Sequence, residues 1–563
     1  MKTDLTKSES KKHYDNVPGT IHLVDLEGNL DVKKNNDDRN IILLPQPSSN
    51  PNDPLRWTQT KKIKQFALLW FWAFLLAVAV NFSGPLWEIW SVDFNVSFFQ
   101  LNVTSALCFL FLGVGCLVLQ PTALKLGRRF VYLLCTIIVL VSCVVGAQAS
   151  NIVSLDINNI LGGFAAAPVD SLVEISSTDV FFQHERASAL AWLILALYAG
   201  SFLGPVACGY ITQSMGWQWC FYFQVIIFGV LFIVLLFFME DTTFRRDYNE
   251  ETLEENILDQ IKSRETVEVG SKEKEHHILA NTKEVSSHSL SDDDASVDYS
   301  IPVRTYWQRM KIFELEYNDE RSWLTIFYRP FFLVSFPAII WGGILYGAQM
   351  MYLSLLSTSQ SIIFSGAPYY FSANKVGLTN ISCCVGSIIG MLYGGPFVDW
   401  LTIRLARRNN GVLEPEFRLY AMVVPTIVNA AGLLAYGLGA SYGAHWAVPA
   451  IIGQGLLGVA MSSSGAICLS YAVDSYQKVA SEGLVLMLFL RNCIGMGFTF
   501  GFQPWLDHNG LKVLTWLLFM LSIVINGSFI FMIKYGKTFR RWTKSSYEKY
   551  SDPYYGELFR KKT

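Results

Sequence analysis

Two carboxylates lie four residues apart in a largely apolar stretch, at Asp170 and Glu174. Residues with this spacing share one face of an α-helix. An ionisable group near the centre of a bilayer costs at least about 2.5–3.5 kcal/mol, so each such residue needs a partner or a function. Together the two carboxylates would attract an amine or ammonium group, and one could exchange a proton with it. The alternative is that Asp170 packs structurally while Glu174 lies near a membrane surface.

Aromatic and amide side chains in other apolar stretches could complete such a site. Aromatic rings bind cations through their faces, and amides can donate or accept hydrogen bonds. The candidates are Trp341, Tyr346, Tyr352, Tyr471, Asn81 and Gln454. Most aromatic residues in a chain that is 14% aromatic belong to lipid-facing surfaces or interfacial belts. The amides could equally hold neighbouring helices together.

One basic residue, Arg491, stands alone in a later apolar stretch. Either it pairs with a buried acid, or its long side chain reaches the edge of the membrane.

The composition indicates which elements must position these residues. Apolar residues make up 52% of the 563 positions and charged residues only 16%, against about 25% in ordinary soluble proteins. No Asp, Glu, Lys or Arg occurs in 187–239 or in 419–473. About 20 apolar residues in a helix cross a hydrocarbon core of about 30 Å, so each run accommodates two spans. The chain is therefore expected to be an all-α polytopic membrane protein.

Apolar runs, read against turn residues and charges, predict twelve spans in two groups of six. They are 65–87, 102–120, 130–149, 155–175, 187–211, 219–239, 331–356, 378–397, 419–440, 446–469, 483–504 and 514–533. The expected organisation is an N-terminal tail (1–62), a six-helix bundle (63–240), a largely disordered central loop (241–330), a second bundle (331–534) and a C-terminal tail (535–563).

The distribution of Lys and Arg predicts the orientation. Nine of these residues fall in short loops on the side of the two termini, and two fall in loops on the other side. Basic residues concentrate in cytosolic loops, so the termini and the central loop are predicted to be cytosolic. The glycosylation sequons at Asn95 and Asn380 would then lie outside, close to the membrane surface.

Charged turns at corresponding places in the two groups of spans suggest gates. Gly127-Arg128-Arg129 follows the second span, and Gly395-Pro-Phe-Val-Asp399 follows the eighth. Acidic and arginine side chains at neighbouring helix ends can lock them by charge-assisted hydrogen bonds. Basic anchoring at the cytosolic surface is the alternative. Six plus six spans joined by a cytosolic loop is a layout typical of secondary transporters.

The fifth span carries a stripe of small residues, with Gly200, Gly204 and Gly209 around Pro205. Such a stripe permits close backbone packing between membrane helices. The freed carbonyl of a helix that contains proline must be satisfied by its neighbours. By composition alone this could be any packed membrane helix.

With these motifs, the chain resembles the Major Facilitator Superfamily, in particular the twelve-span drug:proton antiporter group of fungi. The 200–209 stretch is similar to the antiporter motif of that group. Further motifs resemble the fungal polyamine and histidinol (cation) permease branch. They are Leu44-Pro-Gln-Pro-Ser48, Asp53-Pro-Leu-Arg-Trp57, Asp179-Val-Phe-Phe-Gln-His184, Leu405-Ala-Arg-Arg-Asn-Asn-Gly411 (which follows Arg404), Glu414-Pro-Glu-Phe-Arg-Leu419, Tyr471-Ala-Val-Asp474-Ser-Tyr476 and Arg491-Asn492.

The resemblance implies two pseudo-symmetric bundles whose first, fourth, seventh and tenth helices line a cavity. It also implies that Asp170 is the acidic residue that this branch places nine residues before the Asp of its Asp-Val-Phe-Phe segment. Two positions depart from the wider pattern: Leu124 replaces an acidic residue of the loop motif, and Asn158 replaces an arginine linked to proton movement. Proton coupling by the usual route is therefore not expected.

We hypothesise secondary transport of a small polyamine-like organic cation by alternating access, driven by protons or the membrane potential. The alternatives are efflux of drugs by proton antiport and a nutrient sensor that does not transport. No spacing typical of an enzyme active site, metal site, cofactor site or phosphate-binding loop occurs in the sequence, so we do not expect an enzyme, an ATP-driven pump or a nucleic-acid binder. We expect a monomer in a fungal plasma membrane.

Overall fold

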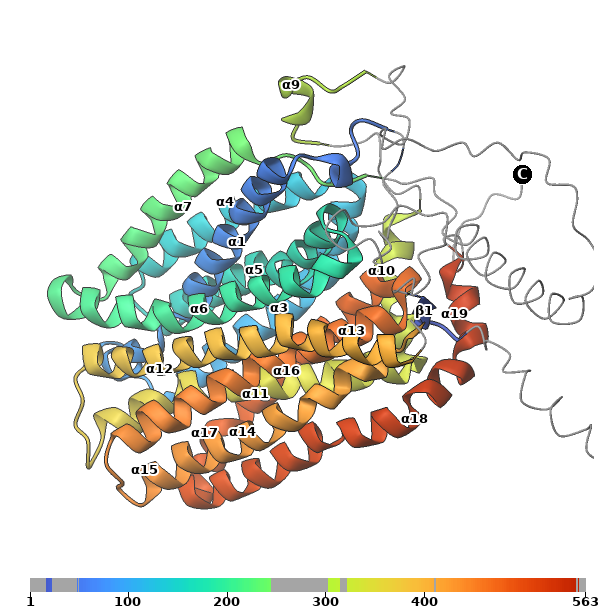
Figure 1. Ribbon diagram of the computed structural model, residues 1–563. Helices are drawn as coiled ribbons and strands as arrows, with labels where there is room; N and C mark the ends of the chain where they lie inside the picture. Colours follow the sequence, from blue (N-terminus) through green and yellow to red (C-terminus); the bar gives the residue numbers. More distant parts are fainter. Residues whose placement is uncertain are drawn as a thin grey trace, which may run out of the picture.

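The computed structural model describes residues 17–22, 48, 50–244, 302–313, 321–409, 412–552 and 555. Long helices lie side by side along one common direction (Figure 1). The described residues also contain one small sheet, in which β1 (Ile21–His22) pairs with β2 (Val412–Leu413). The all-helical prediction is thus confirmed, apart from these two-residue strands.

The first group of helices forms the N-half, which extends from residue 59 to residue 238. Its helices are α1 (Gln59–Asn81), α2 (Trp87–Asp93), α3 (Phe98–Leu126), α4 (Arg128–Ala147), α5 (Ile152–Val180), α6 (Gln183–Met215) and α7 (Gln218–Phe238). Two short 3₁₀ turns, η1 (Pro54–Arg56) and η2 (Gly84–Leu86), precede and follow α1. Each of the six predicted N-terminal spans coincides with one of the long helices to within a few residues, and the first continues through η2 to the start of α2.

The second group forms the C-half, which extends from residue 337 to residue 542. Its helices are α11 (Pro337–Ser365), α12 (Ala373–Leu392), α13 (Val398–Arg408), α14 (Val423–Leu433), α15 (Gly439–Ser441), α16 (Gln454–Ser475), α17 (Ala480–Gly527) and α18 (Phe529–Trp542). Short turns connect or extend them: η4 (Tyr393–Phe397), η5 (Pro415–Met422), η6 (Leu434–Leu438), η7 (Val448–Gly453) and η8 (Gln477–Val479).

Helix α17 contains the eleventh predicted span, 483–504, and most of the twelfth, 514–533, which continues into α18. Its 48 residues would extend about 72 Å as one straight helix, more than twice the thickness of a hydrocarbon core. Gly510 breaks it with φ 72° and ψ 162°, so the chain turns back there. The described residues contain eleven segments long and apolar enough to cross a membrane, and the last of them includes this turn.

The predicted central loop contains more structure than expected. Helices α9 (Tyr306–Arg309) and α10 (Trp323–Phe332) form inside it, followed by η3 (Leu333–Ser335). Thr325, Ile326, Arg329 and Pro330 of α10 are buried, because this segment packs against the bundle. The rest of the predicted loop, 245–301 and 314–320, lies outside the described residues.

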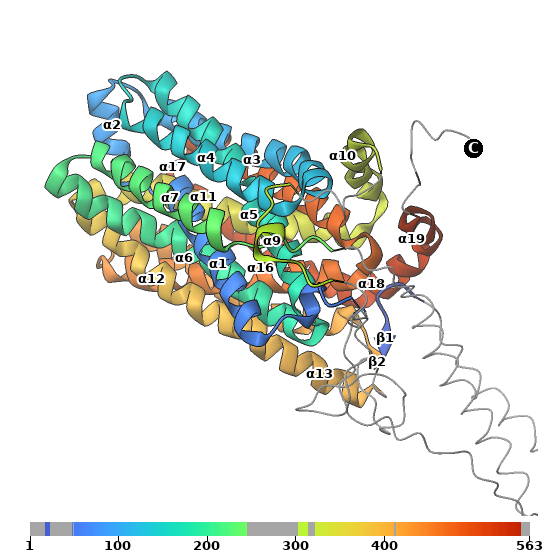
Figure 2. The same cartoon turned by 90° about the horizontal axis from the view of Figure 1, so that it is seen from above.

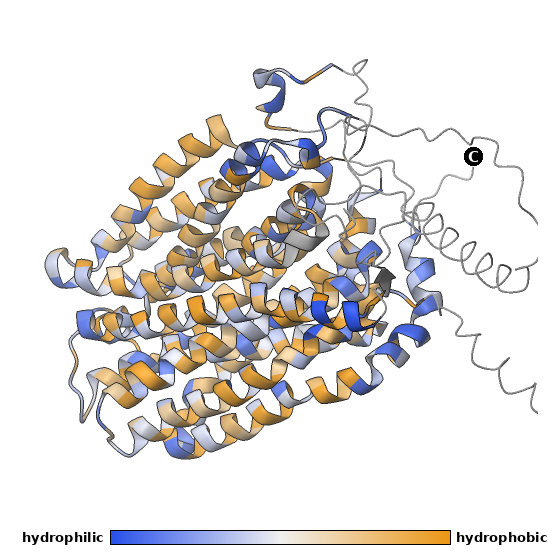
Figure 3. Cartoon of the chain, viewed as in Figure 1, coloured by the Kyte–Doolittle hydropathy of each residue, from blue (hydrophilic) through white to orange (hydrophobic). Residues whose placement is uncertain are grey.

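We call the end of the bundle that carries the sheet, α10, α13, α18 and α19 (Lys544–Ser551) the tail end (Figures 1 and 2). Figure 3 shows hydrophilic residues gathered at this end and hydrophobic ones along the outer helix surfaces. Ile226, Val230 and Ile233 of α7 are exposed, as are Val385 and Ile389 of α12. Exposed apolar stripes of this kind are what a membrane would cover.

Two pairs of helices make the main contacts between the halves: α3 with α17, and α6 with α12. At one end of the α3–α17 pair, Asn102 Nδ2 lies 3.4 Å from Gln503 Oε1. At the tail end, Gln120 donates a 2.8 Å hydrogen bond to Ser481.

Small residues bring backbones together where α6 crosses its neighbours. A Cβ on Gly209 would lie 2.8 Å from the carbonyl oxygen of Ala373, and one on Gly377 would lie 2.6 Å from that of Pro205. Within the N-half, a Cβ on Gly200 would lie only 2.4 Å from the carbonyl oxygen of Phe74 in α1. The stripe predicted in the fifth span therefore faces both α1 and α12.

We expect Gly200→Ala to lower the free energy of unfolding by about 1–3 kcal/mol, because the added methyl group forces two backbones apart. Gly229→Ala in α7 is the matched control, since nothing lies within 4 Å of a Cβ there. That change should be neutral or stabilising by up to about 1 kcal/mol through helix propensity. Unfolding of both purified variants in detergent measures the difference, and equal stabilities would contradict the close packing.

Candidate functional site

A cavity lies between the two halves, near the middle of the long helices. It contains about 550 Å³ of space between its lining atoms, including space open to solvent. Helices α1, α3, α5 and α6 line it from the N-half, and α11 and α17 from the C-half. The lining residues are Leu76, Ala77, Val80, Asn81, Leu112, Ala166, Val169, Asp170, Leu197, Tyr198, Ser201, Tyr346, Met350, Leu353 and Arg491.

An ion pair across the cavity joins the halves. Arg491 in α17 binds both carboxylate oxygens of Asp170 in α5, with Nη1 3.0 Å from Oδ1 and Nη2 on Oδ2. Both residues are 4% exposed. The guanidinium also lies over the ring of Tyr346 at 4.8 Å from its centre. The sequence left two alternatives for Arg491, an ion pair with a buried acid or a side chain that reaches the membrane edge. The structure shows the ion pair.

Glu174 lies one helical turn from Asp170, towards the tail end; it is 2% exposed and is not among the residues that line the cavity. Neither of its carboxylate oxygens has a hydrogen-bond partner among the described residues. An unpaired buried charge costs several kcal/mol, so this carboxyl group must take up a proton or a cation.

The predicted binding residues separate into two groups. Asn81 and Tyr346 line the cavity with Asp170, and Asn81 donates a 3.1 Å hydrogen bond to Ser201 Oγ.

The other predicted aromatic and amide residues lie within the C-half, outside the cavity lining. Trp341 donates to Ser528 and packs edge-on against Tyr471. Tyr352 and Gln454 are fully buried. Sequence reasoning missed Tyr198 and Ser201, because nothing in a single helix pattern marks which face meets the other half.

The predicted gate of the N-half forms an ion pair at the tail end. Arg128 binds Asp179 at the end of α5 and donates a 3.2 Å hydrogen bond to Thr242. Arg129 donates instead to the backbone carbonyls of Leu236 and Lys311. Gly127 caps α3 immediately before this pair.

In the C-half, one arginine holds two acids together. Arg418 lies 2.8 Å from Asp399 and 2.7 Å from Asp474, at the ends of three neighbouring segments. Arg404, expected to take part, is exposed and lies over the ring of Trp400. Arg418 was the residue that sequence reasoning did not select, although it lies in the quoted Glu414–Leu419 motif. Gly395 is buried in the turn η4, just before Asp399.

The two sequons predicted to lie outside, at Asn95 and Asn380, are in different surroundings. Asn95 is exposed in the turn between α2 and α3. Asn380 is 3% exposed inside α12 and donates a 2.7 Å hydrogen bond to Gln360, so a glycan has no room there. The expectation of glycosylation at Asn380 is therefore corrected by its burial.

Comparisons with known proteins identify the wider group. The family model of the Major Facilitator Superfamily matches residues 69–481. A Schizosaccharomyces pombe protein named "Uncharacterized MFS-type transporter C1271.10c" is 29% identical, over 96% of this chain and 95% of its own. "Protein HOL1" of Saccharomyces cerevisiae is 28% identical, over 96% and 98%. "MFS-type transporter penM" of Penicillium rubens is 29% identical, over 81% of each chain.

Solved structures with the same fold are more distant in sequence. The proton:xylose symporter XylE has a TM-score of 0.56 and 13% identity, covering 85% of this chain and 96% of its own. The human organic anion transporter MFSD10 has a TM-score of 0.52 and 14% identity, covering 83% and 99%. These similarities concern the fold.

We expect Asp170→Asn and Arg491→Gln each to lower the free energy of unfolding by about 3–5 kcal/mol, because each leaves the other charge buried and unpaired. The double variant should lose clearly less than the sum of the two. Unfolding measurements on the four proteins in detergent give the coupling. As a control, Lys537→Gln removes the ion pair between Lys537 and Glu414, which is more exposed than the central pair. This change should lower the free energy of unfolding by less than about 1 kcal/mol. Strict additivity at Asp170 and Arg491 would contradict the ion pair.

Proposed function

The chain belongs to the Major Facilitator Superfamily, and from this premise we propose that it is a secondary transporter of small, polyamine-like organic cations. The proposal places it in the cation permease branch that its motifs resemble. The substrate would bind in the cavity between the halves and cross the membrane by alternating access. Protons or the membrane potential would drive the transport.

The unpartnered carboxyl group of Glu174 is the observation that carries this proposal. Arg491 already binds both oxygens of Asp170, so these two charges balance one another. Glu174 then remains as a carboxyl group without a partner among the described residues, one turn away on the same helix. A site that lacks one positive charge is suited to a cation, since an ammonium group supplies both the charge and the hydrogen-bond donors.

The ion pair suggests how binding would be linked to movement. A diamine or longer polyamine that reaches Glu174 with one ammonium group can place the next one near Asp170. It then competes with Arg491 for the same carboxylate. Because Asp170 and Arg491 belong to different halves, the competition weakens a bond between the halves only while the substrate is bound. A differential interaction of this kind is what a ligand needs to shift a conformational equilibrium.

Glu174 is also our candidate for the proton carrier. The positions that the antiporter group uses for proton movement carry Leu124 and Asn158 here, so another carboxyl group has to serve if protons are coupled. Asn158 is occupied in hydrogen bonds with Ser142. A proton on Glu174 would neutralise it when no cation is bound, and substrate and proton would then exchange at one site.

Efflux of apolar drug-like compounds is the second candidate. Most of the residues that line the cavity are apolar, among them Leu76, Val80, Leu112, Val169 and Leu353. Ligand pockets for drug-sized molecules are mostly apolar with a few polar groups. This function requires no role for the unpartnered Glu174 one turn from Asp170, whereas the cation proposal uses it.

We further propose that the protein lies in a fungal plasma membrane with its tail end in the cytosol. The nine-to-two distribution of basic loop residues supports this orientation. The fungal sources of the similar proteins support the host.

We expect cells that express the chain to accumulate radiolabelled spermidine, and Glu174→Gln and Asp170→Asn to reduce the uptake at least about tenfold. A lost charge-assisted hydrogen bond of 1.5–3 kcal/mol accounts for a factor of this size. Uptake at several external pH values should depend on pH less steeply in Glu174→Gln than in the wild type.

Asp156→Asn is the matched control, since it makes the same change near the other end of α5, outside the cavity lining. It should transport as the wild type does, and surface amounts of each variant are measured in parallel. No difference in uptake between expressing and empty cells would reject spermidine as substrate. Drug sensitivity that appears when the protein is deleted would favour efflux instead.

A further inference from the structure

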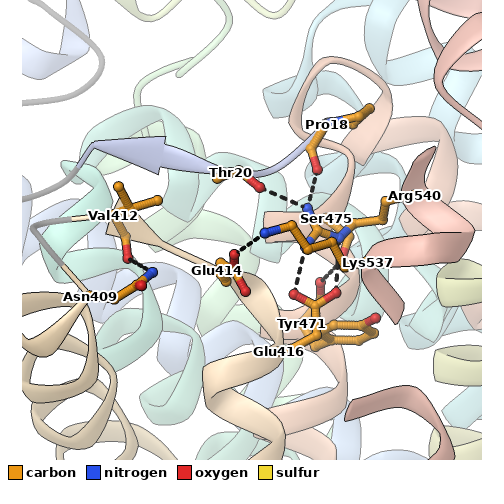
Figure 4. Close-up of polar contacts among 10 residues, drawn as sticks. All are labelled: Pro18, Thr20, Asn409, Val412, Glu414, Glu416, Tyr471, Ser475, Lys537 and Arg540. Carbon is orange, nitrogen blue, oxygen red and sulfur yellow. Dashed lines mark hydrogen bonds and ion pairs between the residues drawn. The ribbon is translucent and has the colours of Figure 1, made fainter. Parts of the chain in front are cut away.

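A short segment near the N-terminus lies on the C-half, although the chain enters the N-half after it. Residues 17–22 run along the tail end (Figure 4). There β1 pairs antiparallel with β2, with Ile21 opposite Leu413 and His22 opposite Val412. Val17, at the start of this segment, is 4% exposed. We call residues 17–22 the strap.

The backbone of the strap lies directly on the end of α16. Gly19 has φ +79°, a conformation that L side chains rarely adopt. A Cβ on Gly19 would lie 2.5 Å from the carbonyl oxygen of Asp474 and 2.8 Å from that of Ser475. Only glycine allows the strap to approach α16 this closely.

A buried arginine fixes the strap from the other side. Arg540 in α18 is fully buried. Its Nε and Nη2 donate to the two carboxylate oxygens of Glu416, at 3.0 and 2.6 Å. Its Nη1 donates to the carbonyl of Pro18 and, at 3.1 Å, to the hydroxyl of Thr20. The guanidinium is therefore held in place by Glu416 and offers its remaining side to an extended peptide (Figure 4).

We propose that this surface is a docking site for the strap, and that the docked strap slows the movement of the end of α16 that accompanies opening of the tail end. The strap touches three separate elements of the C-half, β2, the end of α16 and α18, so movement of α16 relative to the other two must break its contacts. The end of α16 also carries Asp474, which Arg418 binds in the charge cluster of the C-half.

The strap can leave its site at a small cost in free energy. When the strap leaves, Arg540 keeps both oxygens of Glu416, so no buried charge loses its partner. The groups that the strap exposes can bond to water. What is lost is a few hydrogen bonds, each of which contributes about 1 kcal/mol net. This inference requires that the halves move, as transport demands, but not that the substrate is a cation.

Cross-strand cysteines test the docking in membranes without any substrate. The double variant His22→Cys with Val412→Cys places the cysteines at paired positions, where Cα atoms lie about 4.5–5.5 Å apart, within the range of a disulfide. A protease site inserted between 245 and 301 separates the two cysteines into different fragments. Oxidation should keep most of the cleaved molecules joined on a non-reducing gel.

His22→Cys with Leu413→Cys is the matched control, because a shift of one residue points the side chains to opposite faces of the strands. It should cross-link at least about fivefold less. The cleavable chain with only its ten native cysteines serves as the blank. Equal yields from the two pairs, or no cross-link in either, would overturn the docking site.

The effect on opening is read from Ser481→Cys, since Ser481 closes the contact with Gln120 between α3 and α17 at the tail end. Deletion of residues 2–22, and separately Gly19→Val, should raise the alkylation rate of this cysteine by a permeant maleimide at least about threefold. The disulfide-locked strap should lower it by a similar factor, and a reductant should restore it. The deletion leaves the helical body intact if Gly19→Val fails to fold. Unchanged rates in the deleted and locked proteins would show that the strap does not restrain opening.

Discussion

A charge inside a membrane protein must keep a partner through every state of the molecule, and this constraint governs the centre of this fold. Asp170 and Arg491 come from different halves, and each would be buried and unpaired without the other. The penalty for separating them is several kcal/mol. Any movement that parts the halves at this level must therefore supply a substitute for one of them. The two charges of the pair balance one another at the cavity wall, and Glu174 lies one turn away on the same helix without a hydrogen-bond partner among the described residues.

Ion pairs also join helix ends at the tail end, where the charges are less deeply buried. Arg128 with Asp179 in the N-half and Arg418 with Asp399 and Asp474 in the C-half lie at the tail end, less deeply buried than the central pair. Pairs that are closer to water cost less to break. The acids of both clusters include the one that ends the fourth helix of its half, at Asp179 and Asp474. The two halves thus use corresponding positions to hold neighbouring helix ends.

The sequence predicted the positions of the apolar helices well, because long uncharged runs are a property of single helices, although the last two predicted spans lie in one apolar segment that turns at Gly510. It also selected Asp170, Asn81 and Tyr346, which line the cavity together. It could not predict that Arg491 binds Asp170, since the residues are 321 positions apart and no helix pattern records which partner a lone charge meets. Arg418 was overlooked in favour of Arg404 for the same reason. Helix α10 was missed because its apolar face is short and lies within a polar stretch.

The contact between α6 and α12 has a mechanical consequence. At Gly209 and Gly377 the two helices meet backbone to backbone. Interlocked side chains would have to disengage and mesh again in every cycle, and each rearrangement would add a barrier. A crossing without side chains would instead keep the two helices in contact while one of them slides or rolls over the other. If the halves turn against one another during transport, Gly209 and Gly377 keep side chains out of this crossing.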